Sequence, residues 1–220
     1  MVGTLLLMLP FALAGAVSPM VLTEQTVVLA SSGGRKTALR YAAGAVLMLF
    51  IYVVILTAFG RLISLPTHLT FSARLDIGLG VVLILLAVFF RHRGKVKAVK
   101  RDSAKAKPKV TSGQAFGLGV VGMATNVTTI AMMVPATKVI SGAGLGLLED
   151  LILALILVAI ASIPAWLPVT LVMIAPGPAQ RLLNALGNFL GKYGRRLVVV
   201  LFAGLGLYLV IKGLVALPGL

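Results

Sequence analysis

Six long stretches of mostly apolar residues dominate this sequence, and they constrain the fold more than any other feature. A helix needs about 20 apolar residues to cross about 30 Å of hydrocarbon. The stretches are continuous rather than alternating, which predicts helices and not strands. They cover residues 5–30, 39–59, 71–90, 114–140, 148–174 and 196–216. The sequence therefore predicts an all-α integral membrane protein with six transmembrane helices.

The composition excludes a soluble globular protein. Hydrophobic residues make up 60% of the 220 residues, charged residues make up 11%, and the mean hydropathy is +1.10, above the range of soluble domains. The absence of cysteine excludes disulfide scaffolds, thiolate metal ligands and thiol chemistry. No Lys or Arg precedes Arg35, so the basic segment of a cleavable signal peptide is missing. We expect the first stretch to be a retained membrane span.

The positions of 20 Lys and Arg residues against 5 Asp and Glu residues predict the orientation in the membrane. Short loops rich in Lys and Arg stay on the cytoplasmic side. With the N-terminus outside, the inner loops hold Arg35, Lys36 and Arg40, nine bases from Arg91 to Lys109, and Arg181, Lys192, Arg195 and Arg196; the outer side holds Arg61, Arg74, Lys138 and Lys212. This imbalance predicts that both termini lie outside, with the protein in the plasma membrane.

The densest basic segment divides the chain into a first set of helices in residues 1–90, a cytoplasmic loop in residues 91–111 and a second set in residues 112–220. Bases beside the inner leaflet each gain about 1 kcal/mol from anionic lipid, so we expect the loop to bind the membrane surface. Confinement of the bases to loops argues against nucleic acid as a partner. Three helices per set is an odd number, so the second set enters the membrane from the opposite side, as inverted repeats do.

Local patterns suggest how the helices pack. Residues 75–80 resemble residues 201–206 in their spacing of Leu and Gly, which gives modest support for a repeat. Small residues four apart, Gly113 with Gly117 and Gly187 with Gly191, predict close contacts between helices. Residues 181–196 alternate bases with apolar residues and predict a short amphipathic segment on the inner surface.

The first apolar stretch carries the strongest candidate site. Ser18 and Pro19 interrupt it near its middle, and a proline removes a backbone donor and frees carbonyl groups. Thr23 and Glu24 follow, and Glu24 is expected to be the only carboxylate well inside a span. The functional interpretation is a coupling group or an anchor for a substrate headgroup. The alternative is a carboxylate that reaches the cytoplasmic surface or pairs with Arg35 or Arg40.

The fourth and fifth stretches hold the remaining candidates. Asn126 and Thr129 share a helix face at the matching place of the second repeat, as part of a cavity or as hydrogen-bonding contacts between helices. Pro164 and Pro168 predict a kink in the fifth stretch, either a gating hinge or a static bend. Trp166 lies between them, too deep for the membrane interface, and is expected to contact packed side chains or substrate.

Groups for catalysis are sparse. His68 and His92 have no carboxylate or second histidine near them in the sequence to build a metal site or a nucleophile relay. The sequence therefore predicts a protein that is not an enzyme and that uses no cofactor and no metal.

These features together resemble a known group of transporters. The six helices in two inverted threes, Ser18-Pro19 in a broken first helix, residues 33–36 (Gly-Gly-Arg-Lys), the basic loop and Asn126 are similar to the lysine-exporter (LysE) superfamily. Within it the chain looks most like the actinobacterial peptidoglycolipid- and sulfolipid-addressing branch, called GAP or Sap. Amino-acid exporters of the superfamily show Pro-Gly-Pro in the first helix and Asn-Pro-Lys in the fourth. Here residues 18–20 are Ser-Pro-Met and residues 126–128 are Asn-Val-Thr, which favours the lipid-addressing branch.

The resemblance implies export of a lipid or glycolipid, or of a precursor, by alternating exposure of a cavity between the repeats. The expected cavity residues are Ser18, Pro19, Thr23, Glu24, Asn126 and Thr129, with Pro164 and Pro168 as a hinge. Two alternatives remain: an exporter of a small solute such as an amino acid or cation, and a membrane scaffold that recruits an export machine without transporting. Three helices per half enclose little volume, so a homodimer is also expected.

Overall fold

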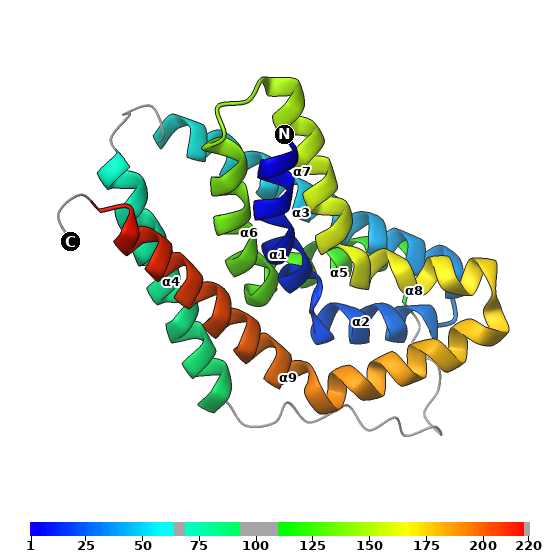
Figure 1. Cartoon of the computed structure of the whole chain (residues 1–220). Coiled ribbons are helices and arrows are strands. Elements are labelled where there is room, and N and C mark those ends of the chain that lie inside the picture. Colours follow the sequence, from blue (N-terminus) through cyan, green and yellow to red (C-terminus); the bar gives the residue numbers. More distant parts are fainter. Residues whose placement is uncertain (64–68, 93–109, 218–220) are drawn as a thin grey trace.

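The computed structural model describes residues 1–63, 69–92 and 110–217, and helices fill most of these ranges (Figure 1). The helices are α1 (Val2–Ala16), α2 (Pro19–Leu29), α3 (Gly34–Ile63), α4 (Leu69–His92), α5 (Ser112–Ala124), α6 (Val127–Ser141), α7 (Leu147–Ala161), α8 (Ile163–Ile174) and α9 (Pro176–Val215). No strand occurs in the described part of the chain, so the all-α prediction is confirmed. His68 and most of the predicted cytoplasmic loop lie outside the described residues.

Three segments are long and apolar enough to cross a membrane: Gly34–Leu62, Ala73–His92 and Pro176–Val215. Three further pairs of helices pass the same test together but are bent, α1 with α2 by 54°, α5 with α6 by 63°, and α7 with α8 by 67°. The described residues thus provide three clear spans, or up to six if each bent pair crosses as one unit. Each predicted apolar stretch coincides with one long helix or one bent pair, while six crossings, inverted repeats and the division at residues 91–111 stay predictions.

The break between α1 and α2 lies where Ser18 and Pro19 predicted it. Pro19 is the first residue of α2, a position where a missing backbone N–H costs nothing. Ser18 caps this helix, because its Oγ accepts a hydrogen bond of 3.4 Å from the Val21 backbone N–H.

The break between α5 and α6 contains no proline. Asn126 follows the end of α5 and caps the start of α6. Its Oδ1 accepts a hydrogen bond of 3.4 Å from the Thr129 backbone N–H. Asn and Asp side chains compete in this way for backbone groups and favour helix ends over helix interiors. Pro135 lies inside α6 without interrupting it.

The kink predicted from Pro164 and Pro168 is present, but it lies at Ser162. Pro164 occupies the first turn of α8 and Pro168 lies within that helix, so only the first proline is at the bend. The Trp166 indole donates a hydrogen bond of 3.0 Å to the Ala159 carbonyl oxygen across the bend. Trp166 also packs against the buried core, as one of its two expected roles requires. Its contact with substrate and a gating hinge at the bend stay predictions.

The expected amphipathic segment, residues 181–196, is not a separate surface helix. It forms the first half of α9, which continues without interruption for 40 residues into the last apolar stretch. Figure 1 shows this helix running along the lower margin and then turning upward beside α4.

Close packing depends on different glycines from those that the spacing predicted. Among the described residues of one chain, a Cβ atom would meet nothing within 4 Å at Gly113, Gly117, Gly187 or Gly191, so the predicted contacts are not made within the chain there.

The tight contact instead joins α4 and α9. A Cβ on Gly80 would lie 2.6 Å from the Gly206 carbonyl oxygen, and one on Gly206 would lie 2.8 Å from the Gly80 carbonyl oxygen. A spacing of four small residues allows close approach, and only the rotation of each helix decides whether the approach occurs.

Large apolar side chains cover the outer surface, as expected where lipid rather than water is the solvent. Leu85 on α4 and Val200 on α9 are among the many exposed examples. Figure 1 places the start of α1 and the α6–α7 turn at the top of the view, the end of α9 at the left, and the α2–α3 turn and the α8–α9 junction on the right.

Candidate functional site

The break between α1 and α2 and the break between α5 and α6 meet in the protein interior. We call this place the central crossing (Ser18, Asn126, Thr129 and the Gly15 carbonyl). Asn126 Nδ2 donates hydrogen bonds of 2.9 Å to Ser18 Oγ and 2.7 Å to Thr129 Oγ1. Thr129 Oγ1 donates a hydrogen bond of 2.9 Å to the Gly15 carbonyl oxygen. Ser18, Asn126 and Thr129 are all buried. Three of the predicted cavity residues therefore lie together.

The side chains that cap the broken helices also supply the bonds between them. Ser18 Oγ caps α2 and accepts from Asn126, while Asn126 Oδ1 caps α6 and accepts a hydrogen bond of 2.6 Å from Thr128 Oγ1. Tyr52 Oη of α3 donates a bond of 3.3 Å to the Ala124 carbonyl oxygen at the end of α5. Polar groups released by a break inside an apolar protein must find such partners, because an unpaired group is costly there.

Glu24 lies near this crossing, on α2, and is half-buried. Its Oε2 accepts a hydrogen bond of 2.6 Å from Tyr41 Oη and sits where a Cβ on Gly122 would collide with it. Glu24 forms no ion pair among the described residues, so the alternative pairing with Arg35 or Arg40 is not observed.

Two further predicted residues flank α2 without joining the crossing. Thr23 is exposed, and its Oγ1 donates to the Pro19 carbonyl oxygen at 2.7 Å. Pro19 packs against α9, where a Cβ on Gly194 would lie 2.7 Å from Pro19 Cγ.

Gln25, next to Glu24, is a buried polar residue that the sequence reasoning missed. Its Nε2 donates a hydrogen bond of 3.1 Å to the Ala38 carbonyl oxygen of α3, and its Oε1 has no partner in the part of the chain that the structure describes. A polar side chain next to a singled-out carboxylate in an apolar stretch was an available signal.

A cluster of charges lies at the other end of α6, around a buried carboxylate near the start of the α4 span. Asp76 of α4 is 5% exposed and forms ion pairs with Lys138 of α6 and, at 3.6 Å, with Lys212 of α9. Three helices far apart in the sequence therefore share one carboxylate. A lone acid and two lone bases in apolar stretches were the available signal, since buried charges are almost always paired.

A second ion pair lies in the same part of the fold. Arg61 of α3 binds Asp150 of α7 at 2.7 Å and also donates a hydrogen bond of 2.9 Å to the Leu145 carbonyl oxygen. Asp150 is buried, and its Oδ1 has no hydrogen-bond partner within residues 1–63, 69–92 and 110–217. We call these two groups the ion-pair end, formed by Arg61, Asp76, Lys138, Asp150 and Lys212.

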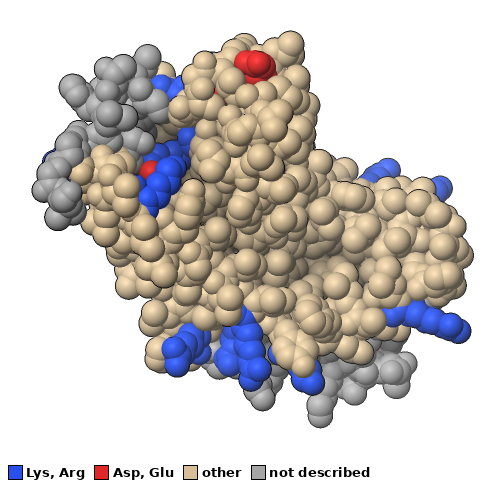
Figure 2. Space-filling view, viewed as in Figure 1, with Lys and Arg blue, Asp and Glu red and all other residues tan. Residues whose placement is uncertain are grey.

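The opposite margin, which we call the basic end (Arg35, Lys36, Arg40, Arg181, Lys192, Arg195 and Arg196), has a different charge pattern. Figure 2 shows Lys and Arg side chains gathered along the lower margin of the molecule, below a broad uncharged face. Arg35, Arg181 and Arg196 are exposed, and none forms an ion pair with the residues that the structure describes.

Comparison with known families identifies the chain. A family model described as Sap, sulfolipid-1-addressing protein, matches residues 8–215, a range that contains the central crossing and both charged ends. The chain belongs to the Sap family. Neither a curated protein nor a solved structure gives a further match. The Sap family links this membrane protein to lipid export, which confirms that part of the resemblance, while the LysE superfamily stays a prediction.

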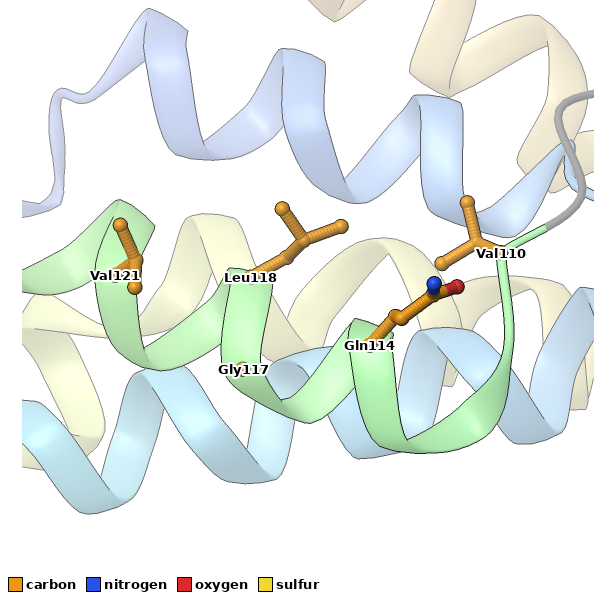
Figure 3. Close-up of a pocket in the computed structure, with 5 residues that line it drawn as sticks. All are labelled: Val110, Gln114, Gly117, Leu118 and Val121. Carbon is orange, nitrogen blue, oxygen red and sulfur yellow. The ribbon is translucent and has the colours of Figure 1, made fainter.

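Two cavities open on the surface of this Sap-family protein. One, of about 420 Å³, lies along the exposed face of α5, and its lining is mostly apolar. Figure 3 shows its residues following one side of that helix: Val110, Gln114, Gly117, Leu118 and Val121. The other, of about 400 Å³, lies at the basic end, where α2, the α2–α3 turn, α8 and α9 meet.

Among the described residues of the Sap-family protein, no three His, Asp or Glu side chains come together as metal ligands. His92 ends α4, and its Nδ1 lies 2.9 Å from the Val88 carbonyl oxygen of its own helix.

Proposed function

We propose that this protein carries a lipid or glycolipid, or a precursor of one, across the plasma membrane by alternately exposing an internal cavity to each side. Membership of the Sap family supports lipid as the class of substrate. The observation that carries the mechanism is the central crossing, where two broken helices are bonded to each other by the hydrogen bond from Asn126 to Ser18. Broken helices that meet in the protein interior are the usual place of substrate and coupling sites in transporters.

The helices on either side of the crossing form two inverted repeats in this proposal. The reciprocal contact of Gly80 with Gly206 supports this arrangement, because each glycine meets the carbonyl oxygen of the other, as residues related by a two-fold axis do. The two glycines are also equivalent positions of the matched segments 75–80 and 201–206.

The two ends of the fold suggest which side is open. Ion pairs tie α3 to α7 and join α4, α6 and α9 at the ion-pair end, while a cavity opens at the basic end. With the basic end cytoplasmic, as the distribution of Lys and Arg predicts, this is an inward-open state. Reopening at the other end requires the ion pairs to separate, and the bend at Ser162 before Pro164 provides a place for α8 to move.

Glu24 is the proposed coupling or headgroup-binding group. Its position between Tyr41 and Gly122 joins α2 to α3 and α5, so a change in its protonation or its partner would act on three helices at once. The proposed reaction is movement only, without chemical conversion of the substrate and without a cofactor or metal. A second copy of the chain is expected to enlarge the cavity, because three helices per half enclose little volume.

The experiment compares a deletion strain with its parent by mass spectrometry of surface-extractable and whole-cell lipids. We expect one lipid class to be lost from the surface and retained in the cell. Restoring the gene with Asn126→Ala should leave the defect. Thr125→Ala should repair it, because among the described residues the Thr125 hydroxyl bonds only to carbonyl groups of α5.

A second pair of variants tests Glu24. Gly122→Ala places a methyl group against the carboxylate and should impair export. Gly117→Ala should not, because this glycine lies five residues earlier on α5 and a Cβ there would meet nothing within 4 Å. If Glu24→Gln supports normal export with unchanged pH dependence, the coupling role is wrong.

The same cultures separate the alternatives. Unchanged surface lipids with an amino acid or cation accumulating in the cell would show a small-solute exporter instead. Normal lipid movement by the purified protein in liposomes would contradict a scaffold, and loss of a partner after neutralising the bases of residues 91–109 would support one.

A further inference from the structure

The cavity at the basic end combines a charged rim with an apolar wall. The charged rim consists of Arg35, Ser32 and Thr26, from α2 and the turn into α3. The apolar wall consists of Leu29, Val172 and Leu183, from α2, α8 and α9. Its volume of about 400 Å³ falls within the usual size of small-molecule sites. A polar rim beside an apolar wall fits a molecule that has both kinds of surface.

The electrostatics of this cavity favour an anion. Arg35 is exposed and has no ion pair among the described residues, and no carboxylate lines the cavity. The cavity also includes Gly34, the first residue of α3, and no acidic residue occupies the first turn of that helix. The positive end of the helix dipole therefore adds to the guanidinium charge.

The backbone at this turn is built to hold the helix start in place. Gly34 has φ +53°, a left-handed conformation that side chains with a Cβ rarely adopt, and its N–H donates to the Ser31 carbonyl oxygen at 3.1 Å. Ser31 is buried and its Oγ bonds to the Val28 carbonyl oxygen at 2.6 Å. The helix start and Arg35 are thus presented from a fixed turn.

We propose that this cavity binds the phosphate- or sulfate-bearing headgroup of an anionic lipid, with Arg35 as its charged contact and Leu29, Val172 and Leu183 against the start of its acyl chains. Arg suits this role because its planar donors match oxyanions in a bidentate manner. The apolar wall favours a lipid over a free anion, which would leave that wall without a partner. The claim that exported substrate enters at this site rests on the proposed function. The claim that the site binds lipid does not.

The absence of cysteine from the chain gives a direct test. Ser32→Cys places a single thiol in the exposed rim of the cavity, and its rate of alkylation by a water-soluble maleimide is measured on the full chain in neutral detergent. The additions are phosphatidylglycerol, phosphatidylcholine, inorganic phosphate and inorganic sulfate. If Ser32→Cys does not purify as a folded protein, Ala30→Cys, also exposed and lining the cavity, replaces it.

We expect phosphatidylglycerol to slow alkylation, and phosphatidylcholine and the two inorganic ions to have little effect. Adding Arg35→Gln should weaken protection by about tenfold in lipid concentration, the loss of one charge-assisted hydrogen bond. Arg40→Gln is the matched control, since Arg40 is exposed on the same helix and does not line the cavity.

Four results would overturn the proposal. Protection by phosphatidylcholine equal to that by phosphatidylglycerol would show that the net charge of the headgroup does not matter. Equal loss of protection in Arg35→Gln and Arg40→Gln would show a general effect of surface charge. Protection by phosphate or sulfate alone, as strong as by lipid, would assign the cavity to a free anion. If phosphatidylglycerol gives no protection of Ser32→Cys while the strain still exports its lipid, this site is refuted and the proposed function stands. If phosphatidylglycerol protects Ser32→Cys but the deletion strain has normal surface lipids, the proposed function is refuted and the lipid-binding site stands.

Discussion

The charged side chains are paired at the ion-pair end of this protein, whereas at the basic end some exposed arginines stand without a carboxylate partner among the described residues. At the ion-pair end each of the two buried carboxylates is bonded to a base from another helix, and one of them, Asp76, serves two lysines. At the basic end exposed arginines such as Arg35 and Arg181 have no carboxylate partner among the described residues. Both ends belong to the same short chain, so composition alone does not explain the difference.

The difference teaches where charge can be left unpaired. A buried ion loses several kcal/mol of hydration, which only a close opposite charge and hydrogen bonds offset. An exposed arginine at the membrane surface keeps its water and gains from anionic lipid. The ion-pair end should therefore be sensitive to the loss of a single charge, and the basic end should not.

The largest effect is expected from Asp76→Asn. It removes the counter-charge shared by Lys138 and Lys212, and we expect the free energy of unfolding to fall by about 3 kcal/mol, at the lower limit for a broken buried pair because Lys212 is 44% exposed. Thermal unfolding in detergent measures it. Arg74→Gln, exposed and two residues earlier on α4, is the control. Equal midpoints for the two variants would show that the ion-pair end adds no stability.

A smaller loss is expected from Arg61→Gln. The substitution leaves Asp150 buried without its base and removes the bond to the Leu145 carbonyl oxygen, which together should cost about 2 kcal/mol. Arg61→Lys keeps the charge but not the paired donors, so its unfolding midpoint should fall between wild type and Arg61→Gln. A midpoint for Arg61→Lys below that of Arg61→Gln would contradict the role of charge.

The smallest effect is expected at the basic end. Arg181→Gln and Arg196→Gln should each change the free energy of unfolding by less than about 0.5 kcal/mol, because both side chains are exposed and form no ion pair among the described residues. The same unfolding curves measure this. A loss as large as that of Asp76→Asn would mean that the basic end is held by charge pairs after all, and the contrast between the ends would fail.

The candidate site was predictable where a single residue has a structural effect that does not depend on its neighbours. Ser18-Pro19 predicted a helix break because proline carries its effect in its own covalent structure. The break at Asn126 was not predicted, because an asparagine can stay in a helix or cap one, and its neighbours decide. Thr23 was expected in the cavity and lies exposed, since its side chain points to the other face of α2.

The sequence could indicate that isolated charges in apolar stretches are paired, but it could not say which charges pair. Asp76 and Lys138 are 62 residues apart, and Arg61 and Asp150 are 89 residues apart. Nothing local relates the members of either pair. The predicted glycine contacts failed in the same way, because spacing places small residues on one face but does not say which helix that face meets.

The sequence by itself determined the helical class, the membrane environment, the positions of the apolar stretches and the resemblance to the Sap family. These follow from properties that add along the chain: hydropathy, the thickness of the hydrocarbon layer and the rules for Lys and Arg in loops. The tertiary structure decided which polar groups meet, where the breaks cross and where a cavity opens. Those depend on helix rotation and on contacts between distant segments, because a buried polar group must find its partner wherever the fold places one.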